Sequence, residues 1–471
     1  MLTARAEFCV PKDFTPFYVL NFFIPEPLSW QAHVTCSSAR KVLSALGIFA
    51  CRIDRVCERG REQQIFRYIL TLKGTSMRIV PWRVSAFFTF AVCMSVCAAS
   101  LQAQTWSAPQ LVENGGGAAV SVNANGTAAV IYAGLASVKT NGVWETPVLL
   151  GSGSPASNIK VAPNGDVLAI WSFRTSNTYV PVEAQAAFFS GGRWGPTLTI
   201  TTNEYGDVYN YGPPSIGFDG NSQATVVWEE YNGSTCSLVA ITGSASAGFG
   251  SRHTLANESA CQGWTQLAVN HIGQAVAVIG VPGILSGPVV ALRRDANGVW
   301  GASVTLEAQQ YRQRQPRIAL GDDGTAVAVW TQRTTDSYAV RTPNRGWSAA
   351  AVVPGVPAVT NTCYVAVDGS GNAVVAYEQY QLPAGLLVQY RSVGGSWGSP
   401  VLLESGGPVA EAATPAGTFV VASGSAVYTL LPRSSTWNKA SFSTVLNVAA
   451  APGIAIAAVA PQVSVSTAAV P

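Results

Sequence analysis

The chain has 471 residues, of which 11% are charged and 48% are hydrophobic, with a formal net charge of +3. This composition excludes a disordered protein, which needs many charges and few apolar side chains. The charge is unevenly spread: residues 1–76 carry 10 Lys/Arg against 6 Asp/Glu, whereas residues 104–471 carry 16 against 19. The main part of the chain therefore lacks a basic surplus, and we expect no nucleic acid among its partners.

Residues 1–76 precede an internal methionine, Met77, and show no periodic apolar pattern. The simplest interpretation is that translation begins at Met77 and that residues 1–76 come from a misassigned start. A genuine N-terminal extension is the alternative. In either case we expect no fold in this segment.

Residues 77–103 have the pattern of a secretory signal peptide. A short basic start is followed by an uncharged apolar stretch from Val84 to Ala99, and the small residue Ala103 ends the segment. One transmembrane helix is the alternative, although the stretch is short for it. We expect cleavage after Ala103, export to the periplasm, the cell surface or the medium, and no integral membrane domain in the mature protein.

From residue 104 onward the chain repeats one unit with a period of 35–57 residues. Its first element is a short alternating strand (A), a turn such as Asn164-Gly165 or Asp323-Gly324, and an apolar strand (B). Asn-Gly and Asp-Gly between apolar strands are a strong hairpin signal. Strand B ends in a bulky residue that recurs across the repeats and that we interpret as packing; examples are Tyr132, Trp171, Trp228, Trp330 and Tyr377.

The second element is a Gly-x-Trp turn that opens another strand (D), and a third strand (C) lies between the two elements. Prolines follow several of these tryptophans, for example Pro147 after Trp144. Because proline cannot donate a ladder hydrogen bond, strand D should lie at a sheet edge. The D-strand tryptophans are Trp106, Trp144, Trp194, Trp300, Trp347, Trp397 and Trp437.

The order A, B, C, D predicts an all-β protein, a β-propeller of four-stranded antiparallel blades, over residues 104–471 as one domain. The D strand at Trp106 comes before any A strand, and the last A–B pair, near Val448 to Val459, has no D strand after it. The N-terminal strand should therefore pair with the last blade and close the ring. This count gives eight blades. Because the sequence signal of the last hairpin is weak, seven blades are the alternative.

The repeat resembles that of exported bacterial proteins of the sialidase-like (BNR-like) β-propeller superfamily, most of them uncharacterised. The similar copy is Val365-Ala366-Val367-Asp368-Gly369-Ser370-Gly371-Asn372-Ala373, and the resemblance covers about residues 104–445. Sialidases also carry an Arg-Ile-Pro motif and Ser-x-Asp-x-Gly-x-x-Trp boxes, which residues 104–471 lack. The resemblance therefore implies the fold and leaves the activity open.

Ligand-binding candidates gather in the connections after strands B and D, which share one face of a propeller. Tyrosine and arginine stack on or hydrogen-bond to sugars and peptides at small entropic cost. We expected the loops 203–212 and 311–317 to flank the third blade. The alternative is that these residues only form polar loops and inter-blade contacts. The candidates are Tyr205, Tyr209, Tyr211, Glu229, Glu230, Arg312, Arg314, Arg317 and Arg333.

The cysteines and histidines of residues 104–471 bear on disulfides and metals. Export allows a disulfide between Cys236 and Cys261, and Cys363 would remain unpaired and buried in a strand A. Two histidines far apart in sequence give no support to a zinc site. The sequence Asp368-Gly-Ser-Gly-Asn372 has too few acidic ligands for a calcium loop and is interpreted as a turn. We expect no metal and no cofactor.

These observations favour an exported, non-catalytic propeller that binds a glycan or a protein through its B–C and D–A connections. A sialidase-like glycoside hydrolase or lyase is the alternative, and a structural surface protein without a small ligand is the second alternative. The identity of the ligand and the oligomeric state are not encoded in any motif of the sequence.

Overall fold

The structure is a computed structural model that divides into two compact units, residues 1–102 and 103–471, each described here by itself. In the first unit, where we expected no fold, β1 (Cys51–Val56), β2 (Ile65–Leu72) and β3 (Thr75–Arg78) form an antiparallel three-stranded sheet. The last of these strands runs across Met77, and the translation start and the signal peptide stay predictions. The described residues are 51–56, 65–72, 75–78, 106–113, 118–132, 134–151, 156–173, 182–204, 214–232, 234–258, 264–280, 286–311, 314–332, 335–355, 363–379, 384–404, 406–460 and 463–470.

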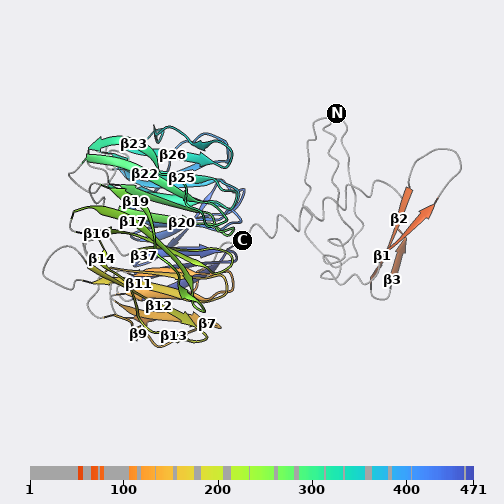
Figure 1. Ribbon diagram of the computed structural model, residues 1–471. Coiled ribbons are helices and arrows are strands. Elements are labelled where there is room, and N and C mark those ends of the chain that lie inside the picture. The colour runs from red at the N-terminus through yellow and green to blue at the C-terminus, as the bar shows by residue number, and fades with distance from the viewer. Residues whose placement is uncertain are drawn as a thin grey trace. The chain divides into compact units, whose positions relative to one another are not determined.

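The second unit is an all-β propeller of eight four-stranded antiparallel blades, and its described residues contain no helix (Figure 1). In blades 1, 2, 3 and 5 strand D consists of two segments that pair with the same strand C. The first four blades are blade 1 with β5 (Ala119–Val122), β6 (Ala128–Tyr132), β7 (Leu135–Thr140), β8 (Val143–Trp144) and β9 (Val148–Leu149); blade 2 with β10 (Ala156–Val161), β11 (Val167–Phe173), β12 (Val182–Ser190), β13 (Arg193–Trp194) and β14 (Leu198–Glu204); blade 3 with β15 (Ser215–Phe218), β16 (Ala224–Tyr231), β17 (Cys236–Ser244), β18 (Gly248–Phe249) and β19 (His253–Glu258); and blade 4 with β20 (Trp264–Val269), β21 (Ala275–Gly280), β22 (Ser286–Arg294) and β23 (Val304–Tyr311).

The other four blades repeat the same order of strands, so the predicted fold class is confirmed and the blade count is eight. They are blade 5 with β24 (Arg314–Leu320), β25 (Ala326–Gln332), β26 (Thr335–Thr342), β27 (Gly346–Trp347) and β28 (Ala351–Val352); blade 6 with β29 (Cys363–Val367), β30 (Ala373–Gln379), β31 (Gly385–Arg391) and β32 (Val401–Glu404); blade 7 with β33 (Pro408–Ala413), β34 (Phe419–Ser423), β35 (Ala426–Leu430) and β36 (Trp437–Ser441); and blade 8 with β37 (Thr444–Ala451), β38 (Ile454–Ala460), β39 (Val463–Ala469) and β4 (Gln110–Glu113).

The N-terminal strand closes the ring as the sequence predicted. Strand β4 pairs antiparallel with β39 of blade 8, and Trp106 forms an isolated bridge to Ala468. The half-buried Trp106 ring meets Phe442 edge to face at 5.7 Å between ring centroids. The last blade therefore combines strands from both ends of the propeller, and β4 supplies its fourth, outermost strand.

In blades 1–7, each A–B turn is stabilised by a side-chain oxygen that accepts a backbone hydrogen bond, and each contains one residue with positive φ. In blade 6, Asp368 Oδ1 accepts hydrogen bonds from the backbone N–H groups of Ser370 and Asn372, both at 2.9 Å, which confirms that this segment is a turn. Gly371 has a φ of 85°, which glycine adopts without steric cost. Blade 3 places Ser222 at the equivalent position with a φ of 62°.

The antiparallel registers place all turns of one kind at one end of the blades. We call the end with the A–B and C–D turns the turn face, and the end with the B–C and D–A connections the loop face. On the turn face, hydrogen bonds link the A–B turns of successive blades from blade 1 to blade 7. They are Asn123 Nδ2 to Ala162 O (2.9 Å), Asn164 N to Ser222 Oγ (3.1 Å), Gly220 N to His271 O (2.8 Å), Asn270 Nδ2 to Gly321 O (3.0 Å), Asp323 N to Gly369 O (3.1 Å) and Gly369 N to Pro415 O (3.1 Å).

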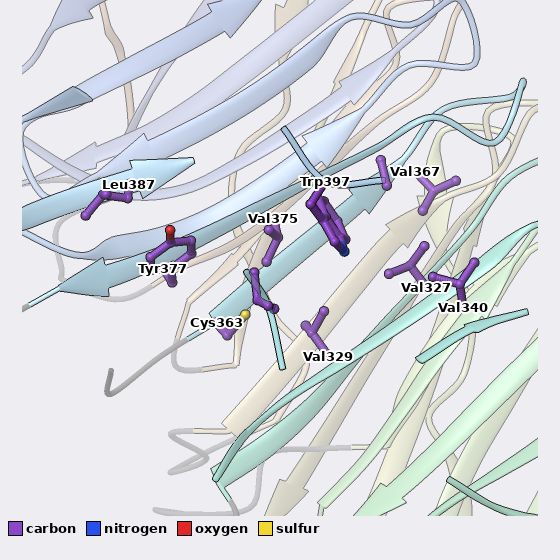
Figure 2. Close-up of a cluster of buried hydrophobic side chains, with 11 residues drawn as sticks. Val327, Val329, Val340, Cys363, Val367, Val375, Tyr377, Leu387 and Trp397 are labelled. Atoms are coloured by element: carbon purple, nitrogen blue, oxygen red, sulfur yellow. The ribbon is translucent and has the colours of Figure 1, made fainter. Parts of the chain in front are cut away.

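The core lies between neighbouring blades, as Figure 2 shows for blades 5 and 6. Tyr377, at the end of strand B, is fully buried there beside Cys363, which is a free and buried cysteine of strand β29, as predicted. Burial raises the pKa of the Cys363 thiol well above its usual value, so this thiol stays protonated. Trp171, Trp228 and Trp330 are also 0–1% exposed. The interpretation of the recurrent B-strand aromatics as packing residues is therefore confirmed for these positions.

Candidate functional site

Nine residues were predicted from the sequence to bind a ligand on the loop face, and four of them are described: Glu229, Glu230, Arg314 and Arg317. Tyr205, Tyr209, Tyr211, Arg312 and Arg333 lie outside the described residues. Arg314 begins strand β24, and its backbone pairs with Thr331. The D–A connections that contain these residues leave from Glu204 and Tyr311, at the loop-face ends of β14 and β23.

The two loops emerge on the same face, but they are farther apart than expected. Residues 205–214 connect blade 2 to blade 3, whereas residues 312–313 connect blade 4 to blade 5. Two blades therefore stand between them instead of the third blade alone. The expectation of one blade was wrong because the loops follow the D strands of blade 2 and blade 4, so that both blade 3 and blade 4 lie between them.

Glu230 is committed to contacts inside the protein. Its Oε1 accepts a hydrogen bond from Trp228 Nε1 at 2.9 Å and forms an ion pair with Arg252 Nη1 at 2.7 Å. The backbone of Glu230 also pairs with that of Glu204, which joins the D strand of blade 2 to the B strand of blade 3. Glu230 and Glu229 are 7% and 3% exposed. Both carboxylates therefore lie at the base of the loops, beneath the surface.

Arg317 lies farther inside, on the A strand of blade 5. Its guanidinium carbon is 4.7 Å from the ring centroid of Tyr364 on β29, an arrangement that gives a cation–π attraction between blades 5 and 6. Arg317 therefore makes an inter-blade contact, which is the alternative role considered for these candidates.

Cys236 is disulfide-bonded, and Cys261 lies outside the described residues. Cys236 begins β17 and pairs with Glu258, the last residue of β19. The predicted partner follows Glu258 by three residues in the connection to blade 4. The pairing of Cys236 with Cys261 stays a prediction that this register favours.

On the turn face, the inner ends of blades 2–7 surround a pocket of about 230 Å³ at the mouth of the central channel. Apolar side chains from the ends of five A strands line this pocket, and we call them its floor: Phe218, Val269, Leu320, Val367 and Ala413. The rim carries polar residues of the turns, which are Asp219, Asn270, His271, Asp322 and Asp368. The sequence predicts these segments as turns and contains no motif that indicates the pocket.

Two ionisable residues of the inner strands were also missed. Glu411 on β33 has both carboxyl oxygens buried without a hydrogen-bond partner, and burial raises its pKa well above the usual value. The side chain of Lys160 on β10 is exposed, but desolvation of its amine by the surrounding protein lowers the pKa. An alignment of the eight A strands would have identified both, because the second and third positions before the turn are otherwise small or apolar.

No group of three or more His, Cys, Asp or Glu side chains that could hold a metal ion occurs among the residues that the structure describes. Within the same described part of the chain, no helix has the length and apolar character needed to cross a bilayer.

Comparison with known proteins shows the fold. No family model and no curated protein matches the sequence. The Dos1 propeller is similar in structure, with a TM-score of 0.55 and 9% identity over 78% of this chain and 95% of that one. The polysaccharide lyase Uly1 (TM-score 0.42, 10% identity, 68% and 91%) and a NanB sialidase variant from Streptococcus pneumoniae (0.37, 11%, 72% and 70%) are more distant. At these identities the likeness establishes the architecture alone, and the chain has the fold of a β-propeller.

Proposed function

We propose that this protein is an exported, non-catalytic binding propeller that holds a glycan or a protein ligand on its loop face. The observation that carries the proposal is the contrast between the A–B turns of the turn face and the connections of the loop face. Five residues connect strands A and B in each of blades 1–7, whereas the connections of the loop face range from two residues to ten. Length variation on a uniform scaffold is typical of the face that carries specificity.

The residues beneath the loops support this division of roles. Glu230 ties Trp228 to Arg252. Trp330 Nε1 similarly donates to Glu307 Oε2 at 2.6 Å, which joins the D strand of blade 4 to the B strand of blade 5. These buried contacts fix the ends of the strands from which the variable connections leave. A rigid base lowers the entropic cost of ordering a binding loop.

The connections add the side chains suited to a polar or acidic ligand. Residues 203–211 contain Tyr205, Tyr209 and Tyr211, and residues 312–317 contain three arginines. Tyrosine offers a flat apolar face with a hydroxyl, and arginine pairs with carboxylate through two parallel hydrogen bonds. In this proposal Glu229 and Glu230 support the loops, while the tyrosines and Arg314 contact the ligand.

The test uses the full-length protein on a glycan array, beside a fluorogenic glycoside panel. We expect at least one bound glycan class or a captured protein ligand, no turnover on the panel, and at least tenfold weaker binding after Tyr209→Ala or Arg314→Ala. The matched control is Arg345→Ala, because Arg345 is exposed on the turn face. Melting temperatures of all variants should stay within a few degrees of the parent.

Three results would contradict the proposal. Turnover of a glycoside would favour the hydrolase or lyase alternative. Binding that Arg345→Ala weakens as much as Arg314→Ala would remove the loop face as the site. A protein that binds no glycan and no protein would favour the structural alternative.

A further inference from the structure

A second site lies on the opposite face, in the pocket of about 230 Å³ at the turn-face mouth of the channel. A cavity of about 150 Å³ is enough to hold a benzene ring. The floor of the pocket offers apolar surface for such a ring, from Phe218, Val269, Leu320 and Val367. The size and floor therefore suit a small aromatic or branched aliphatic group.

The rim is acidic. Asp219, Asp322 and Asp368 line the pocket, and its lining contains no lysine and no arginine. Arg294, which does not line the pocket, is attracted by both Asp219 and Asp295. His271 lies over the backbone of Gly220, where a Cβ atom would stand 2.3 Å from its Cε1. The rim therefore carries a net negative charge beside apolar surface.

Asp219 has a carboxylate oxygen left for a ligand. Its Oδ1 accepts hydrogen bonds from Asn221 N and Gln223 N, both at 2.9 Å, and closes the turn. Its Oδ2 accepts no hydrogen bond from any described residue, although Asp219 is only 7% exposed. This oxygen can therefore accept a hydrogen bond from a cationic donor in the pocket.

The charge at this position is not needed for the turn itself. Asn123 and Asn270 close the equivalent turns of blades 1 and 4 with an amide oxygen: Asn123 Oδ1 accepts from Thr127 N at 3.1 Å, and Asn270 Oδ1 accepts from Gln274 N at 2.9 Å. An aspartate in place of asparagine therefore adds charge to the rim without adding a turn contact.

We propose that the turn-face mouth of the channel binds a small organic cation, in which an apolar ring lies on the floor and an amidinium, guanidinium or ammonium group pairs with Asp219 Oδ2. Asp368, whose Oδ2 accepts a hydrogen bond from Asn372 Nδ2 at 2.8 Å, adds negative charge beside it. This site is independent of the ligand proposed for the loop face, because the two lie at opposite ends of the blades. Planar amidinium and guanidinium groups can donate two parallel hydrogen bonds to one carboxylate, and they fit best.

The probe is benzamidine, titrated into the full-length protein at pH 7.5 and followed by ligand-observed NMR. Its neutral isostere benzamide and the anion benzoate are the comparison ligands. We expect benzamidinium to bind at millimolar or lower concentration, benzamide to bind at least about tenfold more weakly, and benzoate not to bind. Raising the salt from 50 to 500 mM should weaken benzamidinium several-fold, because screening acts on the charged rim.

The variants isolate the rim charge. Asp219→Asn with Asp368→Asn should weaken benzamidinium at least about tenfold, since both changes remove charge while an amide oxygen still accepts the backbone N–H groups that close the turns. Only the hydrogen bond from Asn372 Nδ2 to Asp368 Oδ2 is lost. The matched control is Asp295→Asn: Asp295 Oδ1 accepts two backbone N–H groups at 2.9 Å, attracts the same Arg294, and does not line the pocket. We expect less than a twofold change for this control, and none for Arg314→Ala on the loop face.

The proposal fails if benzamidinium does not bind at 20 mM, or if benzamide binds as tightly. It also fails if Asp295→Asn weakens benzamidinium as much as the double variant does. If the double variant does not fold, the comparison of benzamidinium with benzamide on the unmodified protein decides the question.

Discussion

Glu411 offers a sharp test of how the inner strands are packed. It occupies the third residue pair counted back from the A–B turn, opposite Val421. Both of its carboxyl oxygens are buried without a hydrogen-bond partner. The other seven blades place an apolar residue at this position, namely Val120, Ile159, Ile216, Leu267, Ile318, Val365 and Ala449.

We therefore expect Glu411→Leu to stabilise the propeller at neutral pH. Leaving a buried polar group unsatisfied costs about 1–3 kcal/mol, and a leucine of similar volume removes that cost. For a unit of this size, one kcal/mol corresponds to roughly 1–2 °C in melting temperature. The expected gain at pH 7.5 is thus roughly 2–5 °C, measured by calorimetry or circular dichroism.

The gain should depend on pH in a defined direction. Because burial raises the pKa of Glu411 in the native state, the native protein retains a proton that the unfolded chain loses above its ordinary pKa of 4.5. The free energy of unfolding of the parent should therefore fall as pH rises from about 4.5 towards the raised native pKa. Glu411→Leu removes this slope, so its advantage should grow between pH 5 and pH 8.

Glu411→Gln is the matched control, because glutamine cannot ionise but keeps two polar atoms. It should remove the pH slope with a smaller absolute gain than leucine gives. If Glu411→Leu destabilises the protein, or if its advantage shrinks with rising pH, the carboxylate has a partner in solution and the reasoning is refuted.

Three further predictions concern other parts of the ring. Trp106→Ala should lower the free energy of unfolding by about 2 kcal/mol, roughly half the cost for a fully buried tryptophan, and an unchanged denaturant midpoint would show that β4 does not close blade 8. Peptide mapping without reductant should find Cys236 joined to Cys261, and Cys236→Ser should cost about 3 kcal/mol; a different partner would refute the pairing. Glu404→Gln should destabilise the protein at pH 7 and less so at acidic pH. Burial alone would raise the pKa of Glu404, but hydrogen bonds, including one from Lys439 at 2.8 Å, lower it. The contribution of Glu404 to the free energy of unfolding is therefore present above pH 4.5 and lost below. A deficit in melting temperature that does not depend on pH would contradict this.

The propeller was predictable from the sequence because its turns are encoded locally. Asn164-Gly165 and Asp323-Gly324 specify hairpins without reference to the rest of the chain. The blade count was less certain because the last hairpin, β37 and β38, is rich in alanine and lacks an Asn-Gly or Asp-Gly turn. Strand β39, which completes blade 8 with β4, carries no marker of its own in the sequence.

The sites were less predictable because they depend on depth and on neighbours. From the sequence, Glu230 was predicted to be a loop carboxylate available to a ligand. In the structure its carboxylate instead accepts hydrogen bonds from Trp228 and from Arg252, which follows it by 22 residues. The pocket on the turn face combines residues of six blades, and no local motif contains more than a few of them. Arg317 was grouped with its neighbours in the sequence, yet it points to Tyr364 of the next blade.

The closure of blade 8 sets an order for folding. Ser107 and Thr467 are hydrogen-bonded at 3.2 Å although 360 residues separate them. Blades 1–7 can form hairpin by hairpin as the chain lengthens, since each contains consecutive strands. Strand β4 can pair only after β39 has been formed. Closing the large loop between these two strands has a high entropic cost and is therefore slow. The exposed edge of β4 during that interval is where a folding helper would protect the chain and where misassembly between copies would begin.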